Sequence, residues 1–185
     1  MTDIGGKQEG RKAGGKRRQV AALPWRGEGE ALRFLLVSSR ETRRWVIPKG
    51  WPMKDKSDFA AAAQEAYEEA GLDGVIAQAP VGEYEYLKRL KSGAARLVKV
   101  DVFPMQVTGE HATWPEKGQR TLKWMEPVEA ALAVHEPQLR DLIARFAGVE
   151  LTDEHKLPAK APTPVQVAFQ RLRRRVTALW GRYRR

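Results

Sequence analysis

The chain has 185 residues, with 33 lysines and arginines against 23 aspartates and glutamates, and a formal net charge of +10. This length suits one domain of ordinary size with some additional chain. No apolar run reaches the roughly 18 residues of a membrane-spanning helix, and residues 1–20 lack the apolar core of a secretory signal. The absence of cysteine excludes disulfides and cysteine-based metal sites, and a cytoplasmic location is expected.

The positive charge is concentrated at the two ends of the chain. Residues 1–18 carry six basic and two acidic side chains, and residues 156–185 carry nine basic side chains and no acidic one. The ends therefore hold +4 and +9 of the total of +10, which leaves −3 for residues 19–155. This distribution argues against a uniformly basic nucleic-acid-binding domain.

Turn residues and apolar runs predict the elements in chain order. Glycines mixed with lysine and arginine predict a flexible basic arm over residues 1–16. Apolar and β-branched runs predict strands over residues 19–25, 31–37, 45–47, 75–90, 95–107 and 121–125. A helix is predicted from Ser57 or Asp58 to about Ala70, with Gly71 as its left-handed stop.

Two short helices are predicted to begin at Pro127 and Pro137, because proline is favoured at the first helical position, and the second ends near Gly148. Residues 151–164 are a predicted linker. Residues 165–185 predict a cationic amphipathic helix with an apolar stripe about 120° wide. Such a helix suits attachment to nucleic acid or an anionic membrane, and the alternative is that its stripe packs on the domain or on a second subunit of a homodimer.

Three glutamates, Glu65, Glu68 and Glu69, share one stripe of the helix predicted over residues 58–70. The small residues fall on a separate face, which suits close packing on a sheet. Like charges four residues apart destabilise a helix, and on a surface such a stripe is usually only solvated. Here a Pro-Lys-Gly loop precedes the helix and can bring Gly50 to the carboxylates. Hard oxygen ligands of this kind suit Mg²⁺ or Mn²⁺.

The stretch from Gly50 to Leu72 resembles the signature of the Nudix hydrolases, G-x5-E-x7-R-E-U-x-E-E-x-G-U, in which U is a bulky apolar residue. The matching positions are Gly50, Glu65, Glu68, Glu69, Gly71 and Leu72. Runs outside the signature, Phe34 to Arg40, Trp45 to Gly50 and Trp114 to Met125, are similar to the branch that hydrolyses diphosphoinositol polyphosphates and diadenosine polyphosphates. The resemblance implies an α/β (α+β) fold over residues 17–150, with a mixed β-sheet sandwiched between helices.

The same resemblance implies roles for the matching positions. Glu65 and Glu69 are expected to bind a divalent metal ion, Glu68 to act as base or further ligand, and Gly50 to contribute a carbonyl; Glu65 and Glu68 are the candidate catalytic residues. Glu116, in the loop before the last strand, is a candidate further metal ligand, with Glu110 second. The implied reaction is attack of water on a phosphoanhydride, whose negative charge requires neutralisation.

Lys56 stands where the signature has glutamate, Gln64 where it has arginine, and Ala66 where it has a bulky apolar residue. An arginine at position 64 would neutralise and orient a carboxylate, and Gln64 brings a hydrogen bond without charge. The joint change at 56 and 64 suggests that the two positions pair, and Lys49, Lys54 or Lys56 can restore positive potential. The alternative function is a catalytically weakened or inert Nudix-fold module that binds or regulates.

Candidate substrate contacts are polar and basic residues expected around one polyphosphate cleft. They are Arg18, Ser39, Arg40, Lys49, Lys88, Arg89 and Arg120. Trp51 and Trp114, in predicted loops, are candidates for stacking on a base, whereas Trp124 lies in a predicted strand and is expected in the core. The three histidines show no metal-binding spacing. The expected substrate is a nucleoside diphosphate linked to another group, a dinucleoside polyphosphate or a diphosphoinositol polyphosphate.

Overall fold

The computed structural model describes residues 17–89 and 93–152. The arm predicted over residues 1–16 and the cationic helix predicted over residues 165–185 lie outside the described residues, as does the predicted linker beyond Thr152. No helix within the described part is long and apolar enough to cross a bilayer.

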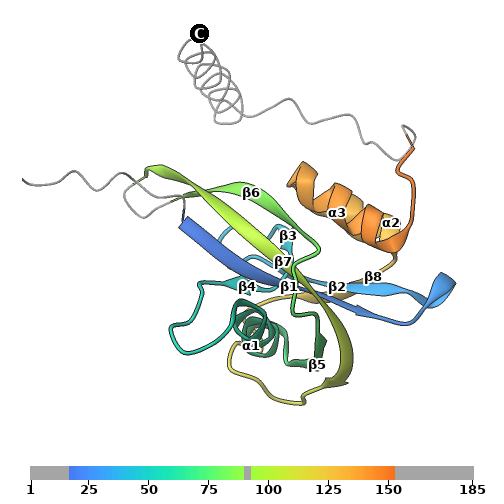
Figure 1. Ribbon diagram of the computed structural model, residues 1–185, viewed down its shortest axis with the longest axis horizontal. Helices are drawn as coiled ribbons and strands as arrows, with labels where there is room; N and C mark the ends of the chain where they lie inside the picture. Colours follow the sequence, from blue (N-terminus) through green and yellow to red (C-terminus); the bar gives the residue numbers. More distant parts are fainter. Residues whose placement is uncertain (1–16, 90–92, 153–185) are drawn as a thin grey trace, which may run out of the picture. The chain divides into compact units, whose positions relative to one another are not determined.

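A mixed β-sheet forms the centre of the fold (Figure 1). Its strands are β1 (Arg17–Arg26), β2 (Arg33–Ser38), β3 (Trp45–Val46), β4 (Lys49–Gly50), β5 (Leu72–Ile76), β6 (Gly82–Arg89), β7 (Ala95–Glu110) and β8 (Leu122–Met125). The order β3-β2-β1-β7-β5 forms its main path, while β4 pairs with β1, β6 with β7 and β8 with β2. β1 runs parallel to β7, and the other strand pairs are antiparallel.

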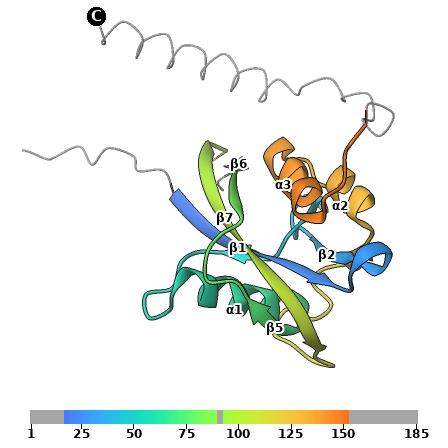
Figure 2. The same ribbon diagram turned by 45° about the vertical axis from the view of Figure 1, so that its right-hand side comes forward.

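Helices lie on both sides of this sheet. α1 (Asp58–Ala70) covers one face, and α2 (Pro127–Ala133) and α3 (Pro137–Ala147) lie on the other side, as Figures 1 and 2 show. A short 3₁₀ turn, Gly29–Ala31, joins β1 to β2. The predicted fold class, a mixed sheet sandwiched between helices, is therefore confirmed.

Successive side chains of β1 and β2 point to opposite faces of the sheet, and residues on both faces are buried. Val20 and Val37 belong to the apolar cluster under α1. On the other face, the ring of Phe34 meets the ring of Phe146 from α3, with 5.9 Å between centroids. Because both faces are covered, the strands are apolar at successive positions rather than alternating with polar residues.

Helix α1 begins and ends where the sequence predicts. The Ser57 hydroxyl accepts a hydrogen bond from the Ala60 N–H at 3.4 Å, and Gly71 adopts a left-handed φ of 69°. Its small alanines let the helix approach the sheet closely. The buried face includes Glu69, so the helix is rotated farther toward the carboxylate stripe than the apolar pattern indicates.

The strand predicted over residues 75–90 is two strands. β5 and β6 pair with different parts of the long strand β7, and residues 77–81 between them face only two residues of β7. Five residues cannot pair with two, so this segment, which contains Pro80, leaves the sheet. The strand predicted over 45–47 is β3, which ends at Val46 before Pro48, and the sequence did not predict the separate two-residue strand β4 that follows and pairs with β1.

Candidate active site

Four glutamates gather beside β4, three from α1 and one from a distant loop. Glu65, Glu68 and Glu69 come from α1, and Glu116 comes from the loop between β7 and β8. The Glu116 N–H donates to the Glu68 carbonyl at 3.0 Å, and the His111 N–H donates to the carbonyl of Gly71 at 2.7 Å. These backbone bonds fix the loop against the end of the helix. The four side chains are called the carboxylate cluster below.

The Glu65 carboxylate lies against the backbone of Gly50. A Cβ atom at Gly50 would overlap Glu65 Oε1, so no other residue fits there without displacing the carboxylate. Gly50 is held in place by its pairing with Val20 of β1. The close approach explains why a glycine is needed at the start of the signature, and it places a main-chain segment next to the candidate ligand.

Burial raises the pKa of Glu65 to about 7, and repulsion from Glu69, Glu68 and Glu116 adds to the rise. Arg120 opposes it only in part. Among the described residues, none forms a hydrogen bond or ion pair with this carboxylate. The local excess of negative charge is therefore uncompensated at Glu65, which favours binding of a cation.

Glu69 is the most deeply buried member of the cluster, at 5% exposed. Its Oε1 accepts from the guanidinium of Arg120, and its Oε2 accepts from the Lys49 N–H at 3.4 Å. Burial raises the pKa of this carboxyl, while Lys49 and Arg120 act in the opposite direction. Glu69 is therefore held from both sides, unlike Glu65.

Arg120 joins the loop to the carboxylate cluster. Besides Glu69, its Nε donates to Glu116 Oε2 at 2.8 Å and its Nη1 donates to the Ser38 carbonyl at 3.3 Å. The side chain is only 6% exposed. Arg40, from the turn after β2, reaches the other oxygen of Glu116 at 3.2 Å. The sequence predicts Arg120 as a substrate contact, and the structure places its donors on protein acceptors.

Gln64 and Lys56 are directly connected. The Lys56 ammonium donates to Gln64 Oε1 at 2.9 Å, and Gln64 Nε2 donates to Glu68 Oε1 at 2.7 Å. Two of the three positions at which the chain departs from the signature therefore form one chain of hydrogen bonds that ends on Glu68. Lys56 carries the positive charge, and the neutral Gln64 links it to Glu68 by hydrogen bonds. An arginine at position 64 would contact Glu68 directly.

Lys49 connects the carboxylate cluster to a second polar region. Its main chain bonds Glu69, while its ammonium lies 5.9 Å from the ring centroid of Tyr86. The Tyr86 hydroxyl donates to Gln19 Oε1 at 2.7 Å. Burial lowers the pKa of Lys49, against the attraction of Glu69 and Glu136. A buried ammonium with few fixed acceptors is suited to a phosphate oxygen.

The other predicted substrate contacts are dispersed. Arg18 is engaged by Asp58 at 2.8 Å and by Asp101 at 2.6 Å. The Lys88 ammonium lies 5.0 Å from the ring centroid of Trp51. Ser39 bonds Thr42 and Arg44 within its own turn, and Arg89 is exposed at the end of β6. Lys49 and Lys88 therefore share one region, Arg40 lies at Glu116, and Arg18 is bound to acidic neighbours.

The loop tryptophan Trp114 has a packing role. Its ring lies over Gly71, where an added Cβ would come within 2.6 Å of the indole. Trp124 packs against the core as predicted, and the Arg26 guanidinium lies 4.0 Å above its ring. The second-choice ligand Glu110 is paired with Arg26 at 2.7 Å, away from the cluster.

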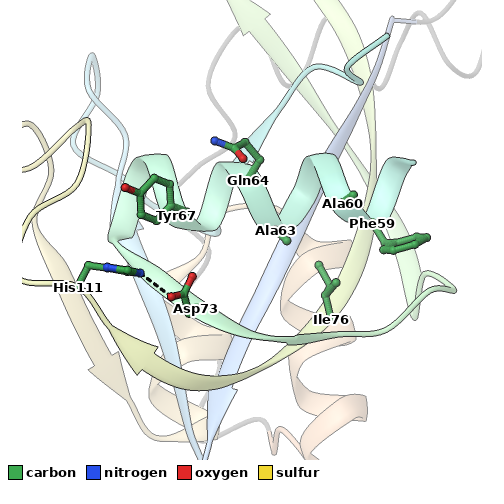
Figure 3. Close-up of a pocket in the computed structure, with 8 residues that line it drawn as sticks. All are labelled: Phe59, Ala60, Ala63, Gln64, Tyr67, Asp73, Ile76 and His111. Atoms are coloured by element: carbon green, nitrogen blue, oxygen red, sulfur yellow. Dashed lines mark hydrogen bonds and ion pairs between the residues drawn. The ribbon is translucent and has the colours of Figure 1, made fainter. Parts of the chain in front are cut away.

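A shallow groove of about 580 Å³ lies along α1 and β5 (Figure 3). Its lining residues are Phe59, Ala60, Ala63, Gln64, Tyr67, Asp73, Ile76 and His111. His111 Nε2 contacts Asp73 at 2.5 Å and its ring meets Tyr67 edge to face. None of the four clustered glutamates lines this groove.

Within residues 17–89 and 93–152, no three acidic or histidine side chains converge as a complete set of metal ligands. Arg120 and Gln64 hold Glu69 and Glu68 in their present orientations. The donor chemistry nevertheless fits a hard divalent cation, because Glu65 is an uncompensated carboxylate in contact with the Gly50 main chain. The sequence did not predict that Tyr84, Tyr86 and Glu136 lie in the region of Lys49, because no local motif identifies these three residues.

Similarity to known proteins identifies the family of this chain. The NUDIX domain family model matches residues 15–146. The chain is 32% identical over 140 residues to Nudix hydrolase 16, mitochondrial, of Arabidopsis thaliana, covering 69% of this chain and 77% of that protein. It is 29% identical over 127 residues to diphosphoinositol polyphosphate phosphohydrolase 3-alpha of Mus musculus, covering 66% and 73%.

The likeness extends to a solved structure. The Ap4A hydrolase of C. elegans shares the fold with a TM-score of 0.52 at 18% sequence identity, covering 72% of this chain and 97% of that one. The family match and the sequence relatives together establish the assignment. The chain belongs to the Nudix family and is a pyrophosphohydrolase, an enzyme that hydrolyses phosphoanhydride bonds.

Proposed function

We propose that this hydrolysis depends on Mg²⁺ or Mn²⁺ and acts on a small molecule that carries a polyphosphate. The observation that carries the proposal is the uncompensated carboxylate of Glu65 on the Gly50 main chain. Glu65 and Glu69, with the Gly50 carbonyl, would hold the cation, and Glu68 and Glu116 would complete the set. When bound, such a cation neutralises phosphate oxygens and activates the attacking water.

The protein side chains contribute orientation and proton transfer. Glu68 is the proposed base, because its carboxylate is held by one neutral donor, Gln64, and keeps an oxygen for the proton of water. Arg120 positions Glu69 and Glu116. Arg40 and Lys49 are the proposed phosphate contacts, since Arg40 is exposed beside Glu116 and Lys49 lies beside Glu69.

The link from Lys56 through Gln64 to Glu68 supports an active enzyme over the alternative of an inert binding module. An inert module would have no need of a cation aligned on the candidate base. Here the charge missing from position 64 is supplied from position 56. The named relatives, a diphosphoinositol polyphosphate phosphohydrolase and an Ap4A hydrolase, indicate which substrates to test first.

The test is hydrolysis, with Mg²⁺ or Mn²⁺, of dinucleoside polyphosphates, nucleoside diphosphates linked to other groups, and diphosphoinositol polyphosphates. The wild type is expected to release phosphate-containing products, and Glu68→Gln is expected to lower kcat about 100-fold. Glu28→Gln, an exposed substitution of the same kind, is the control and should leave kcat unchanged. If neither ion supports turnover of any of these compounds, the proposal is wrong.

We also propose that residues 165–185 attach the enzyme to an anionic surface. The support is the sequence, in which residues 156–185 carry nine basic side chains and no acidic one. Removing residues 163–185 should abolish salt-sensitive binding to RNA or to vesicles of anionic lipid while hydrolysis continues. Binding that is unchanged by the truncation would contradict attachment through this segment.

A further inference from the structure

Arg120 contacts two of the carboxylates that the proposed function assigns to the divalent cation. Its guanidinium donates to Glu69 Oε1 and, through Nε, to Glu116 Oε2 at 2.8 Å. A third donor, Nη1, reaches the Ser38 carbonyl at 3.3 Å. The Arg120 side chain is only 6% exposed, so these ion pairs are largely withdrawn from water. A cation of the protein itself therefore neutralises part of the carboxylate cluster.

The oxygens of the cluster differ in whether a protein donor already holds them. Besides the Arg120 contacts, a main-chain N–H donates to Glu69 Oε2 at 3.4 Å, and Arg40 donates to Glu116 Oε1 at 3.2 Å. Every carboxylate oxygen of Glu69 and Glu116 thus has a donor. Glu65 has none among the described residues. A hard cation can bind Glu65 directly, but it must displace a protein donor to bind Glu69 or Glu116.

The main chain beside Arg120 is fixed independently of these ion pairs. The Thr121 N–H donates to the Ser38 hydroxyl at 2.9 Å, and the Ser38 N–H donates to the Thr121 carbonyl at 2.8 Å. Ser38 is the buried last residue of β2. The guanidinium can therefore leave Glu69 by rotation about its own side-chain bonds, while the main chain stays on β2.

A divalent cation and the Arg120 guanidinium repel each other when both lie on the same carboxylates. The repulsion is strong here because Arg120 and Glu69 are buried, and charges in the protein interior are screened less than charges in water. Removing the guanidinium would end this repulsion and free Glu69 Oε1 and Glu116 Oε2 at once. Arg40 repels a cation less, because its side chain is 58% exposed.

We infer that Arg120 is an internal counter-cation that competes with the divalent metal ion for Glu69 and Glu116. Glu65 stays available to the ion, whereas Glu69 becomes available only when the guanidinium gives way. Arg120 thus lowers the affinity of the cluster for metal while it stabilises the buried carboxylates. The inference rests on the proposed function, because it takes the carboxylate cluster to be the metal site.

The test measures Mn²⁺ binding to the full chain, without substrate or phosphate, from the electron paramagnetic resonance signal of the free ion. Arg120→Gln is expected to bind Mn²⁺ about tenfold more tightly than the wild type, because the competing charge is gone. A guanidinium that only positions the carboxylates for the ion predicts the opposite, weaker binding. Arg120→Lys keeps the charge but loses the fork that reaches both carboxylates, so it should tighten binding about threefold. It serves as the second variant if the first does not fold.

Arg40→Gln is the matched control, because it removes the same charge from the same Glu116 at a more exposed side chain. It should change Mn²⁺ affinity by no more than about twofold. Unchanged or weaker binding in the Arg120 variants, or an equal gain in Arg40→Gln, would overturn the inference. Hydrolysis by the wild type is measured separately. Turnover with Mn²⁺ but no gain in affinity contradicts the inference alone, and a gain in affinity without turnover contradicts the proposed function alone.

Discussion

The Lys56 ammonium donates to Gln64 Oε1, and the same Gln64 side chain donates to Glu68. Lys56 thus occupies the position at which the Nudix signature has a glutamate, and Gln64 the position at which it has an arginine. Together they form a chain of hydrogen bonds that ends on the Glu68 carboxylate. The Gln64 amide donates to Glu68 through its nitrogen, and Lys56 favours this orientation because it donates to the amide oxygen. The charge of Lys56 therefore fixes the orientation of the glutamine amide.

Lys56→Glu is predicted to lower kcat/KM about tenfold, because the new carboxylate attracts the Gln64 amide nitrogen and turns its oxygen toward Glu68. Adding Gln64→Arg to this variant should restore at least the wild-type value, since the pair of the signature is then rebuilt. Lys54→Glu, an exposed change in the same loop, is the control. Steady-state kinetics on one phosphoanhydride substrate measures all four proteins. A double variant as slow as Lys56→Glu alone would show that the two positions are not coupled.

Glu65→Gln is predicted to stabilise the protein at about pH 8 and to have little effect at about pH 5. The pKa of Glu65 in the folded state, about 7, lies above its ordinary value of 4.5, so ionising Glu65 costs folding free energy as the pH rises between these values. The neutral amide removes that cost. Thermal melting of the wild type and the variant at the two pH values gives the comparison. A difference in Tm that does not change with pH would contradict the assigned cause.

The same melting experiment tests the metal site. Mn²⁺ is expected to raise the Tm of the wild type at about pH 8, where Glu65 is ionised, and to raise it less at about pH 5. The gain should fall in Glu65→Gln, while Glu28→Gln, an exposed control, should respond like the wild type. An equal response of the Glu65 and Glu28 variants would remove Glu65 from the set of ligands.

Arg120→Gln is predicted to lower the free energy of unfolding by about 3 kcal/mol near neutral pH, because it leaves Glu69 buried without its cation. Arg140→Gln, at a surface helix, is the control and should cost much less. Urea unfolding measures both. Adding Mn²⁺ should recover part of the loss in Arg120→Gln, since the ion compensates the same carboxylates. A loss no larger than that of the control would show that the guanidinium does not hold the cluster.

Comparing the stability losses of Gly71→Ala and Gly148→Ala separates the cost of backbone strain from the cost of a steric clash. Both glycines end helices with left-handed φ values, 69° and 67°. An added Cβ at Gly148 meets nothing within 4 Å, whereas at Gly71 it meets Trp114 at 2.6 Å. We expect a loss of about 1 kcal/mol for Gly148→Ala and about 3 kcal/mol for Gly71→Ala by urea unfolding. Equal losses would mean that Trp114 gives way without cost.

The Gly71 substitution should also lower kcat. Trp114 belongs to the loop that carries Glu116 and Arg120, so displacing its ring moves two members of the site. Gly148 is far along the chain from this loop, and Gly148→Ala should keep the wild-type kcat. Activity is measured at a temperature at which both variants are folded, which separates this effect from loss of stability.

The elements that depend on neighbouring residues could be predicted from the sequence. Ser57 and Gly71 mark the ends of α1 because capping uses groups within one helical turn. The stripe of Glu65, Glu68 and Glu69 follows from helical periodicity alone, and the pairing of positions 56 and 64 follows from their joint departure from the signature. The division of the predicted strand over residues 75–90 could not be predicted, because it depends on which residues of β7 remain to pair.

The sequence by itself determined the family, the stripe of three glutamates and the helix that presents it, since these depend on residue types at fixed short spacing. Only the tertiary structure decided which carboxylate is left uncompensated. Arg120 lies 51 positions from Glu69 in the chain and Glu136 lies farther still, and folding brings both to the region around Lys49. Charges that meet through folding have no fixed spacing in sequence, so their pairing follows from packing alone.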